Sequence, residues 1–144
     1  MVTIIALTAI SILLCVFLHY EGLRGLAYFV EHVHHAPRRY IIVIILGTIA
    51  LHILSVGLFA ITYYLAVEIW QLSAFGHSFD HTALDYFYYS AQVYTTLGFG
   101  DLSPQGELRI LTSIQPICAL ILFAWSGSFT YLTINKLWKL HLPR

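Results

Sequence analysis

The sequence has few charged residues for its length. Only 10% of its 144 residues are charged and 59% are hydrophobic, whereas a soluble domain has about 25% charged residues. Too little charge remains to cover a surface that faces water, so the composition excludes a soluble monomer, and it excludes a disordered chain as well. Basic and acidic side chains are equal in number, seven of each. Without a basic surplus, no nucleic acid is expected as a partner.

Cysteine is scarce too. Cys15 and Cys118 both lie inside apolar stretches, which argues against a fold held together by disulfides. The sequence also lacks a grouping of serine, histidine, cysteine or carboxylate residues that would fall in one catalytic or metal-binding pocket. We therefore do not expect an enzyme.

Charge is entirely absent from three stretches, residues 1–20, 40–67 and 110–135. Charge-free apolar runs of about 18 residues or more predict transmembrane helices. The earliest basic residue, Arg24, follows the first run, whereas a cleaved signal peptide opens with basic residues. We therefore expect the first helix to remain in the mature protein. The predicted fold is an all-α integral membrane protein with three transmembrane helices.

Lysine and arginine are missing from residues 68–107, where five acidic side chains occur. Basic residues gather instead in the first connection and near the C-terminus: Arg24, Arg38, Arg39, Lys136, Lys139 and Arg144. Basic loops tend to stay in the cytoplasm. We therefore expect a multi-pass protein of the cell membrane, surrounded by the lipid bilayer, with the N-terminus outside and the C-terminus in the cytoplasm.

The first connection mixes apolar, charged and histidine residues. Together with the first helix it forms an N-terminal region, residues 1–39, in which residues 21–39 suit an amphipathic helix at the cytoplasmic interface. His32, His34 and His35 could bind a metal or sense pH, but no carboxylate or cysteine completes a ligand set. A wet loop at the level of the lipid headgroups is the favoured interpretation.

A fourth uncharged stretch, residues 86–100, is too short to cross a membrane. As a helix it would reach about 22 Å, against a hydrocarbon core of about 30 Å, so it is expected to be re-entrant or buried. Gly98 and Gly100 flank Phe99, and alternating glycines adopt backbone angles that let successive carbonyls point the same way. Such a row of carbonyls, with a threonine hydroxyl, can replace the hydration shell of a monovalent cation.

Residues 95–101 read TTLGFGD and resemble the selectivity filter of tetrameric potassium channels. The resemblance extends over residues 40–135, where an outer helix, a short pore helix, the filter and an inner helix follow in the family's order. It implies an ion-channel pore domain over 40–135, followed by a short cytoplasmic tail, residues 136–144. It also implies a homotetramer with C4 symmetry, because one chain carries one filter and several copies are needed to close a ring.

The resemblance assigns the potassium-binding carbonyls to five successive residues: Thr96, Leu97, Gly98, Phe99 and Gly100. Thr95, Gln92 and Asp101 are implied as supports of the filter. Three residues depart from the commonest pattern, because Leu97 replaces valine, Phe99 replaces tyrosine and Gln92 stands where some relatives have glutamate. The amide of Gln92 can still hydrogen-bond to Asp101.

The expected function is a channel that conducts potassium passively, with K⁺ as the permeant ion and no other cofactor. A less selective monovalent cation channel and a non-conducting membrane subunit with the same fold remain alternatives. Pro116 and Gly127 are candidate hinges for gating within the inner helix. No stretch carries the regularly spaced basic residues of a voltage sensor, so opening is expected to depend on the pore, the membrane, pH or an unknown regulatory subunit.

Overall fold

The computed structural model describes residues 1–31, 37–72, 75–76 and 79–141. The elements follow in the order α1 (Val2–Glu31), α2 (Pro37–Tyr64), the π-helical segment η1 (Leu65–Ile69), α3 (Ala83–Tyr94) and α4 (Leu108–His141). Apart from an isolated bridge between Phe75 and Pro104, these described residues form no strand, as the all-α prediction requires. The histidine cluster at residues 32–35 lies outside the described residues.

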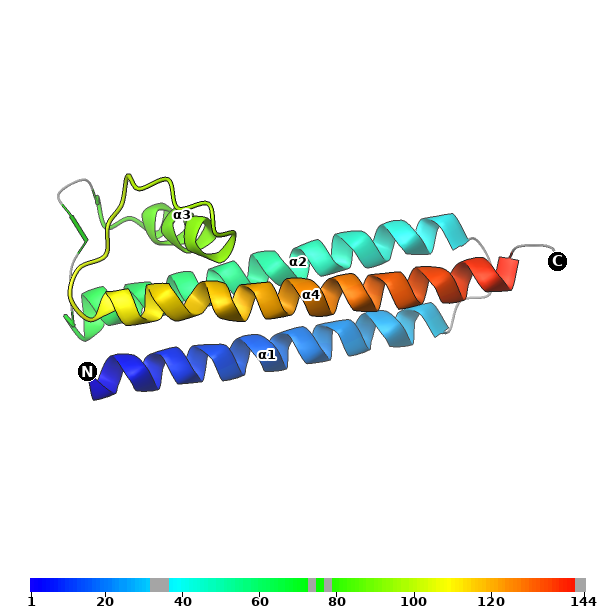
Figure 1. Cartoon of the computed structure of the whole chain (residues 1–144), viewed down its shortest axis with the longest axis horizontal. Coiled ribbons are helices and arrows are strands. Elements are labelled where there is room, and N and C mark those ends of the chain that lie inside the picture. Colours follow the sequence, from blue (N-terminus) through cyan, green and yellow to red (C-terminus); the bar gives the residue numbers. More distant parts are fainter. Residues whose placement is uncertain (32–36, 73–74, 77–78, 142–144) are drawn as a thin grey trace.

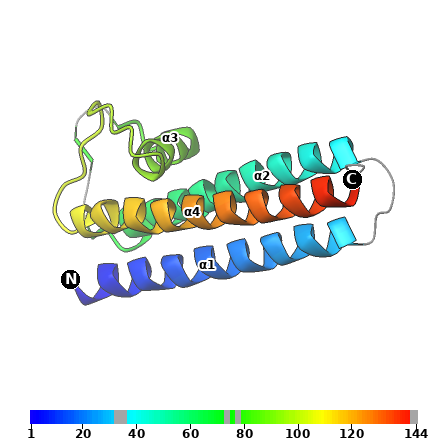
Figure 2. The same cartoon turned by 45° about the vertical axis from the view of Figure 1, so that its right-hand side comes forward.

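Three long helices lie side by side, and the short α3 lies against one end of the bundle next to α2 and α4 (Figures 1 and 2). α1 and α4 run in the same direction and α2 runs in the opposite one, so the two termini lie at opposite ends. The amino group of Met1 pairs with Glu107 just before α4. We call the end that carries α3 and residues 95–107 the α3 end, and the other the opposite end.

All three long helices are long and apolar enough to cross a membrane, which confirms the three predicted spans. Only 28%, 28% and 22% of their most apolar windows are buried within the chain. Most apolar side chains of the bundle therefore face outward, as in a protein whose surroundings are lipid or neighbouring subunits. The protein is a multi-pass membrane protein.

The start of α2 lies close to the charge-free stretch predicted from residue 40, whereas the end of α1 differs from the prediction. α2 begins at Pro37, a favoured first residue of a helix. α1 continues to Glu31, whereas the sequence predicted a separate interfacial segment from residue 21. Glu21 and Arg24 form an ion pair at 3.0 Å on the helix surface, and this i, i+3 pairing is compatible with an unbroken helix.

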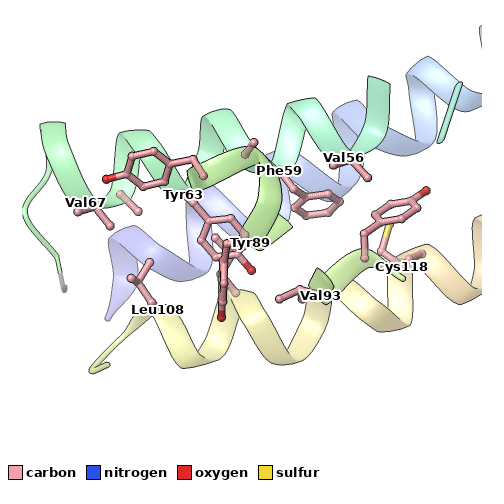
Figure 3. Close-up of a cluster of buried hydrophobic side chains, with 14 of the residues drawn as sticks. Val56, Phe59, Tyr63, Val67, Tyr89, Val93, Leu108 and Cys118 are labelled. Carbon is pink, nitrogen blue, oxygen red and sulfur yellow. The ribbon is translucent and has the colours of Figure 1, made fainter. Parts of the chain in front are cut away.

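The main core lies at the α3 end, where α2, α3 and α4 meet. Its aromatic centre contains Phe59, Tyr63 and Tyr89, and the rings of Tyr63 and Tyr89 meet edge-to-face with centroids 5.0 Å apart. Figure 3 shows these side chains between the three ribbons. Edge-to-face pairs add about 1 kcal/mol beyond burial, so this cluster holds α3 firmly on the bundle.

Glycines allow α1 and α2 to approach closely away from this core. A methyl group built at Gly22 would lie 2.2 Å from Leu51 Cδ2, and one at Gly47 would lie 2.6 Å from Leu26 Cδ2. Each helix thus offers a glycine to a leucine of the other. Small residues at such contacts are the usual way for membrane helices to pack without a hydrophobic driving force.

Candidate functional site

α3 begins with a complete capping box. The Thr82 hydroxyl accepts a hydrogen bond from the Asp85 N–H at 3.2 Å, and the Asp85 carboxylate accepts one from the Thr82 N–H at 3.1 Å. These bonds satisfy two donors that a helix start otherwise leaves unpaired. The carboxylate of Asp85 also lies at the positive end of the helix dipole. The start of α3 is therefore fixed by its own residues.

Buried hydrogen bonds join α3 to both neighbouring helices. Ser90 Oγ donates to the carbonyl of Val56 on α2 at 2.7 Å. Gln115 of α4 donates to the Ser90 carbonyl at 3.1 Å and accepts from the Tyr63 hydroxyl at 2.8 Å. Ser90 and Gln115 are fully buried. Polar groups buried with their partners specify one arrangement of the helices, so α3 and the loop after it have a defined position.

At the end of α3 the backbone turns back on itself. The N–H of Thr96 donates to the carbonyl of Val93 at 3.1 Å, and the N–H of Leu97 donates to the carbonyl of Gln92 at 3.0 Å. The N–H of Gly98 points to the same Gln92 carbonyl at 3.4 Å. The donors at the start of this loop are therefore directed toward α3. Among the described residues, no backbone N–H donates to the carbonyls of residues 96–100.

Every second residue of the loop is left-handed. The φ angles are +61° at Thr96, +52° at Gly98 and +82° at Gly100. Alternation between left- and right-handed residues turns successive carbonyls toward one side of the chain. The sequence predicts this conformation for the two glycines but not for Thr96, a β-branched residue for which a positive φ is a genuine outlier. Strain of about 1–3 kcal/mol at such a residue is typical of functional sites.

The side chains of the loop are exposed on the surface of the isolated subunit. Leu97 is 63% exposed and Phe99 is 65% exposed. Thr95, Thr96 and the two glycines are exposed as well. Two large apolar side chains thus lie at the surface of one short loop.

Asp101, at the outer end of the loop, is held by two side chains of α3. Gln92 Nε2 donates to Asp101 Oδ1 and the Tyr88 hydroxyl donates to Asp101 Oδ2, each at 3.0 Å. These hydrogen bonds, that of Gln92 first, lower the pKa of the Asp101 carboxyl. The sequence anticipated the contact of Gln92 but missed Tyr88. The spacing of Tyr88 and Gln92, one helical turn apart on α3, is the signal that would have found it.

Two histidines have partners that the sequence did not identify. His81 Nδ1 lies 2.6 Å from Glu68 Oε1, which also accepts from the Tyr86 hydroxyl at 2.5 Å. This network ties the segment before α3 to η1. His52, in the middle of α2, lies 3.0 Å from the hydroxyl of Tyr94 through Nδ1. The imidazole in the middle of α2 is thus bonded to the last residue of α3.

The two hinge candidates lie within α4 and away from the loop. α4 passes through Pro116 as a single helix, and Gly127 lies 11 positions further on. Two polar residues of α4 are bonded to other helices. Thr112 bonds to Tyr89 at 3.0 Å and Ser126 to His19 at 2.7 Å.

The arrangement of these helices agrees with a match between the sequence and a known protein family. The model of a family described as "Ion channel" matches residues 40–134, which include α2, α3, the loop and most of α4. The chain belongs to this ion channel family. Neither the curated proteins nor the solved structures gave a match. The match does not include residues 1–39, which contain α1.

Membership in the family gives the chain a general role. Conduction of ions is the family's activity, and its members typically assemble in a lipid bilayer. Of the residues named from the sequence, those at 95–101 lie together in one exposed loop, with Gln92 directly behind it.

Proposed function

We propose that the chain is the subunit of a potassium-selective channel and that residues 96–100 form its selectivity filter. The observation that carries the proposal is the left-handed φ at Thr96, Gly98 and Gly100 in a loop whose first donors are turned toward α3. This leaves the carbonyls of the loop for an ion. A row of backbone carbonyls that replaces the water around K⁺ is the recognised basis of potassium selectivity.

α3 contributes to ion binding through its direction. It is a 12-residue helix, about 18 Å long, and ends at Tyr94 immediately before the loop. The C-terminal end of a helix carries a partial negative charge, which attracts cations to that end. We therefore assign α3 as a re-entrant pore helix. The hydroxyl of Thr96 would add an oxygen to the innermost site.

A homotetramer follows from the exposed loop. One chain supplies one row of carbonyls, and a ring around an ion requires several copies related by a closed symmetry. The exposed side chains of Leu97 and Phe99 would be covered by the neighbouring chains, which removes apolar surface from water at the mouth of the pore. C4 symmetry is the arrangement that the resemblance to potassium channels implies.

The filter is supported from behind by Gln92 and Asp101, and Thr95 fixes the turn between α3 and the filter. The Thr95 hydroxyl donates to the carbonyl of Ala91 at 2.7 Å. With Tyr88 as a third support, the loop is held at both ends while its middle faces the ion. Loss of these supports should alter the rate or the stability of conduction more than the choice of ion.

We propose that the α3 end faces outside the cell. Among the described basic residues other than Arg109, Arg24 lies in the second half of α1, Arg39 near the start of α2 and Lys136 near the end of α4, all toward the opposite end of the bundle. The acidic residues after α2 lie in η1, in α3 or in the segments next to α3, at the α3 end. Single cysteines introduced at Asp80 and Lys136, in a background without the two native cysteines, would test this. Labelling of the residue-80 variant alone by an impermeant reagent in intact cells supports the orientation, and labelling of the residue-136 variant alone reverses it.

The decisive experiment measures ion preference. The purified channel in a planar bilayer should reverse at a potential that corresponds to at least a tenfold preference for K⁺ over Na⁺, equivalent to about 1.4 kcal/mol. Thr96→Ala should lower this preference only partly, because the substitution removes the hydroxyl and keeps the backbone carbonyl. A wild-type permeability ratio near one would identify a less selective cation channel. Absence of current from a verified tetramer would identify a non-conducting subunit.

We further propose that gating involves α4, with Pro116 and Gly127 as points where the helix can bend. Proline removes one hydrogen bond of the helix, and a side chain at Gly127 would meet nothing within 4 Å. Single-channel records of Pro116→Ala test the first point. An unchanged open probability would leave Gly127 as the remaining candidate hinge.

A further inference from the structure

α1, which lies outside the residues that the family model matches, is bonded to α4 by a buried histidine. His19 has no exposed surface, and its Nε2 lies 2.7 Å from the hydroxyl of Ser126. Its ring also packs against Trp125, with centroids 5.8 Å apart. Ionisable side chains inside a membrane span are costly and point to function, so this contact calls for an explanation beyond packing.

Ser126 differs from neighbouring hydroxyl residues of α4. Ser128 and Thr133 donate to carbonyls of their own helix, at 2.9 and 2.8 Å, which is the usual solution in a span. Among the described residues, the Ser126 hydroxyl hydrogen-bonds instead to His19 of α1. The hydroxyl of Ser126 therefore serves a contact between helices.

Burial of His19 costs free energy, because its other ring nitrogen makes no hydrogen bond to the described residues. His19 Nδ1 is buried without a hydrogen-bond partner among the described residues. A neutral imidazole has one donor and one acceptor nitrogen. If Nε2–H donates to Ser126, the nitrogen left over is a bare acceptor, which is less costly to bury than an unpaired N–H. A phenylalanine would avoid this cost, so the bond to Ser126 is what the histidine provides.

A second contact carries the link to the filter. The rings of His19 and His52 have centroids 5.0 Å apart, and His52 Nδ1 lies 3.0 Å from the Tyr94 hydroxyl. Tyr94 is the last residue of α3 and is buried. A continuous row of contacts thus runs from Ser126 through the two histidines to the residue that precedes the filter loop.

α4 changes character directly after Ser126. Seven residues of α4 from Leu108 to Ser126 are buried, but within residues 127–138 the one buried residue is Leu137. A groove of about 500 Å³ lies beside this later part and is lined by Thr48 and His52 of α2 and by Gly127 and Thr130 of α4. The part of α4 after Gly127 therefore has both a flexible residue and space beside it.

We propose that His19 is a positioning residue for conduction: it fixes α4 immediately before Gly127 and, through His52 and Tyr94, ties that point to the base of the filter loop. α1 is then a built-in gating element of the channel. The inference rests on the proposed conduction through residues 96–100. It adds the helix that controls when conduction occurs.

Single-channel recording of four proteins tests the proposal: wild type, His19→Phe, Ser126→Ala and the double variant. His19→Phe keeps a ring of similar size and Ser126→Ala removes one oxygen, so both should fold. Each single variant should change the open probability about fivefold in the same direction, as expected for the loss of one buried hydrogen bond. The double variant should change it no further, because both substitutions remove the same contact. Ser126→Thr keeps the hydroxyl, and His19→Gln replaces the imidazole by an amide that can also hydrogen-bond. Both variants should therefore gate more like wild type than Ser126→Ala and His19→Phe do.

The matched control is Ser11→Ala. Ser11 Oγ lies 2.7 Å from Thr62 Oγ1, so this bond has the same length as that of His19 but joins α1 to α2 and not to α4. The open probability of the Ser11→Ala channel should stay within twofold of wild type, whereas a general loosening of α1 would change it as much as His19→Phe does. Equal effects of the two variants, additive effects in the double variant, or no effect of either single variant would overturn the proposal. A wild-type channel without potassium preference would instead overturn the proposed selectivity, since open probability is recorded with any permeant cation.

Discussion

The two ends of the bundle are built by different means. At the α3 end, side chains such as Ser90 and Gln115 bond across helices, and a core of aromatic rings surrounds them. At the opposite end, the described core consists of Ile44 and Leu137 with a few partly buried neighbours. Hydrogen-bonded cores specify position, whereas sparse apolar contacts allow a helix to shift. The chain therefore holds its loop by many buried contacts and holds the last part of α4 by few.

The largest effect should come from exchanging Gly98 in the loop for alanine, with the same exchange at Gly127 within α4 as its counterpart. Gly98 has a φ of +52°, which alanine adopts only at a cost of about 1–2 kcal/mol per chain, so Gly98→Ala should abolish potassium-selective current. Gly127 lies in the helix α4, so Gly127→Ala should keep the permeability ratio of wild type. Reversal potentials under bi-ionic conditions measure both. A selective Gly98→Ala channel would refute the filter assignment.

A smaller effect should follow when a buried bond is removed at the α3 end. Gln115→Leu removes bonds to Ser90 and Tyr63. At about 0.6 kcal/mol per bond between membrane helices, the free energy of unfolding should fall by about 2 kcal/mol. Thr133→Val at the opposite end, where the hydroxyl bonds only to Phe129 of its own helix, should change it by less than about 0.5 kcal/mol. Unfolding in mixed detergent micelles measures both variants, and equal losses would remove the difference between the ends.

The contact between α1 and α2 predicts an effect of about 1 kcal/mol. Gly22→Ala places a methyl group against the terminal methyls of Leu51, which can move at the modest cost of overpacking. Gly25→Ala, almost one turn further along α1, meets nothing within 4 Å and should stabilise slightly because alanine favours helix. Opposite signs of the two changes in the same unfolding assay are the expected result. A loss of stability in Gly25→Ala would contradict the assigned packing.

The smallest effect concerns pH at the filter. Because its hydrogen bonds lower the pKa of the Asp101 carboxyl, the charged form and its network persist as pH falls through the ordinary carboxyl range near 4. Any contribution of this network is complete above that range and is lost only as pH falls through the lowered pKa. Current–pH curves should therefore be flat from pH 7 to about 5. Gln92→Ala removes the largest cause of the shift and should move the acid-induced change to higher pH, and an unmoved curve would exclude Gln92 as its cause.

The sequence was sufficient for the features that depend on local composition. The three spans follow from stretches without charge, the start of α2 from Pro37, and the left-handed loop conformation from Gly98 and Gly100. The contact between Gln92 and Asp101 was also foreseeable, since the resemblance to potassium channels pairs these two positions. Each of these features involves residues close in the sequence or a recognised motif.

Contacts between distant segments were not foreseeable. His19 and Ser126 are 107 positions apart, and nothing in the apolar pattern of α1 or α4 specifies which faces meet. The left-handed Thr96 was missed for another reason, because local propensity opposes it and the strain is accepted only where the surrounding structure imposes it. The sequence shows which segments enter the membrane, but the pairing of their faces depends on the complete set of helices.

The paired glycines and leucines of α1 and α2 also bear on the order in which the protein is made. Both helices leave the ribosome before α4, and about 75 residues separate Leu51 from Ser126. At about 5–20 residues per second this delay lasts roughly 4–15 s, which is longer than the docking of preformed elements needs at the fast end of its range, on the order of milliseconds. A hairpin of α1 and α2, closed by Gly22 on Leu51 and Gly47 on Leu26, can therefore exist while α4 is still being synthesised. α4 then arrives last, on a surface that already presents His19 and His52.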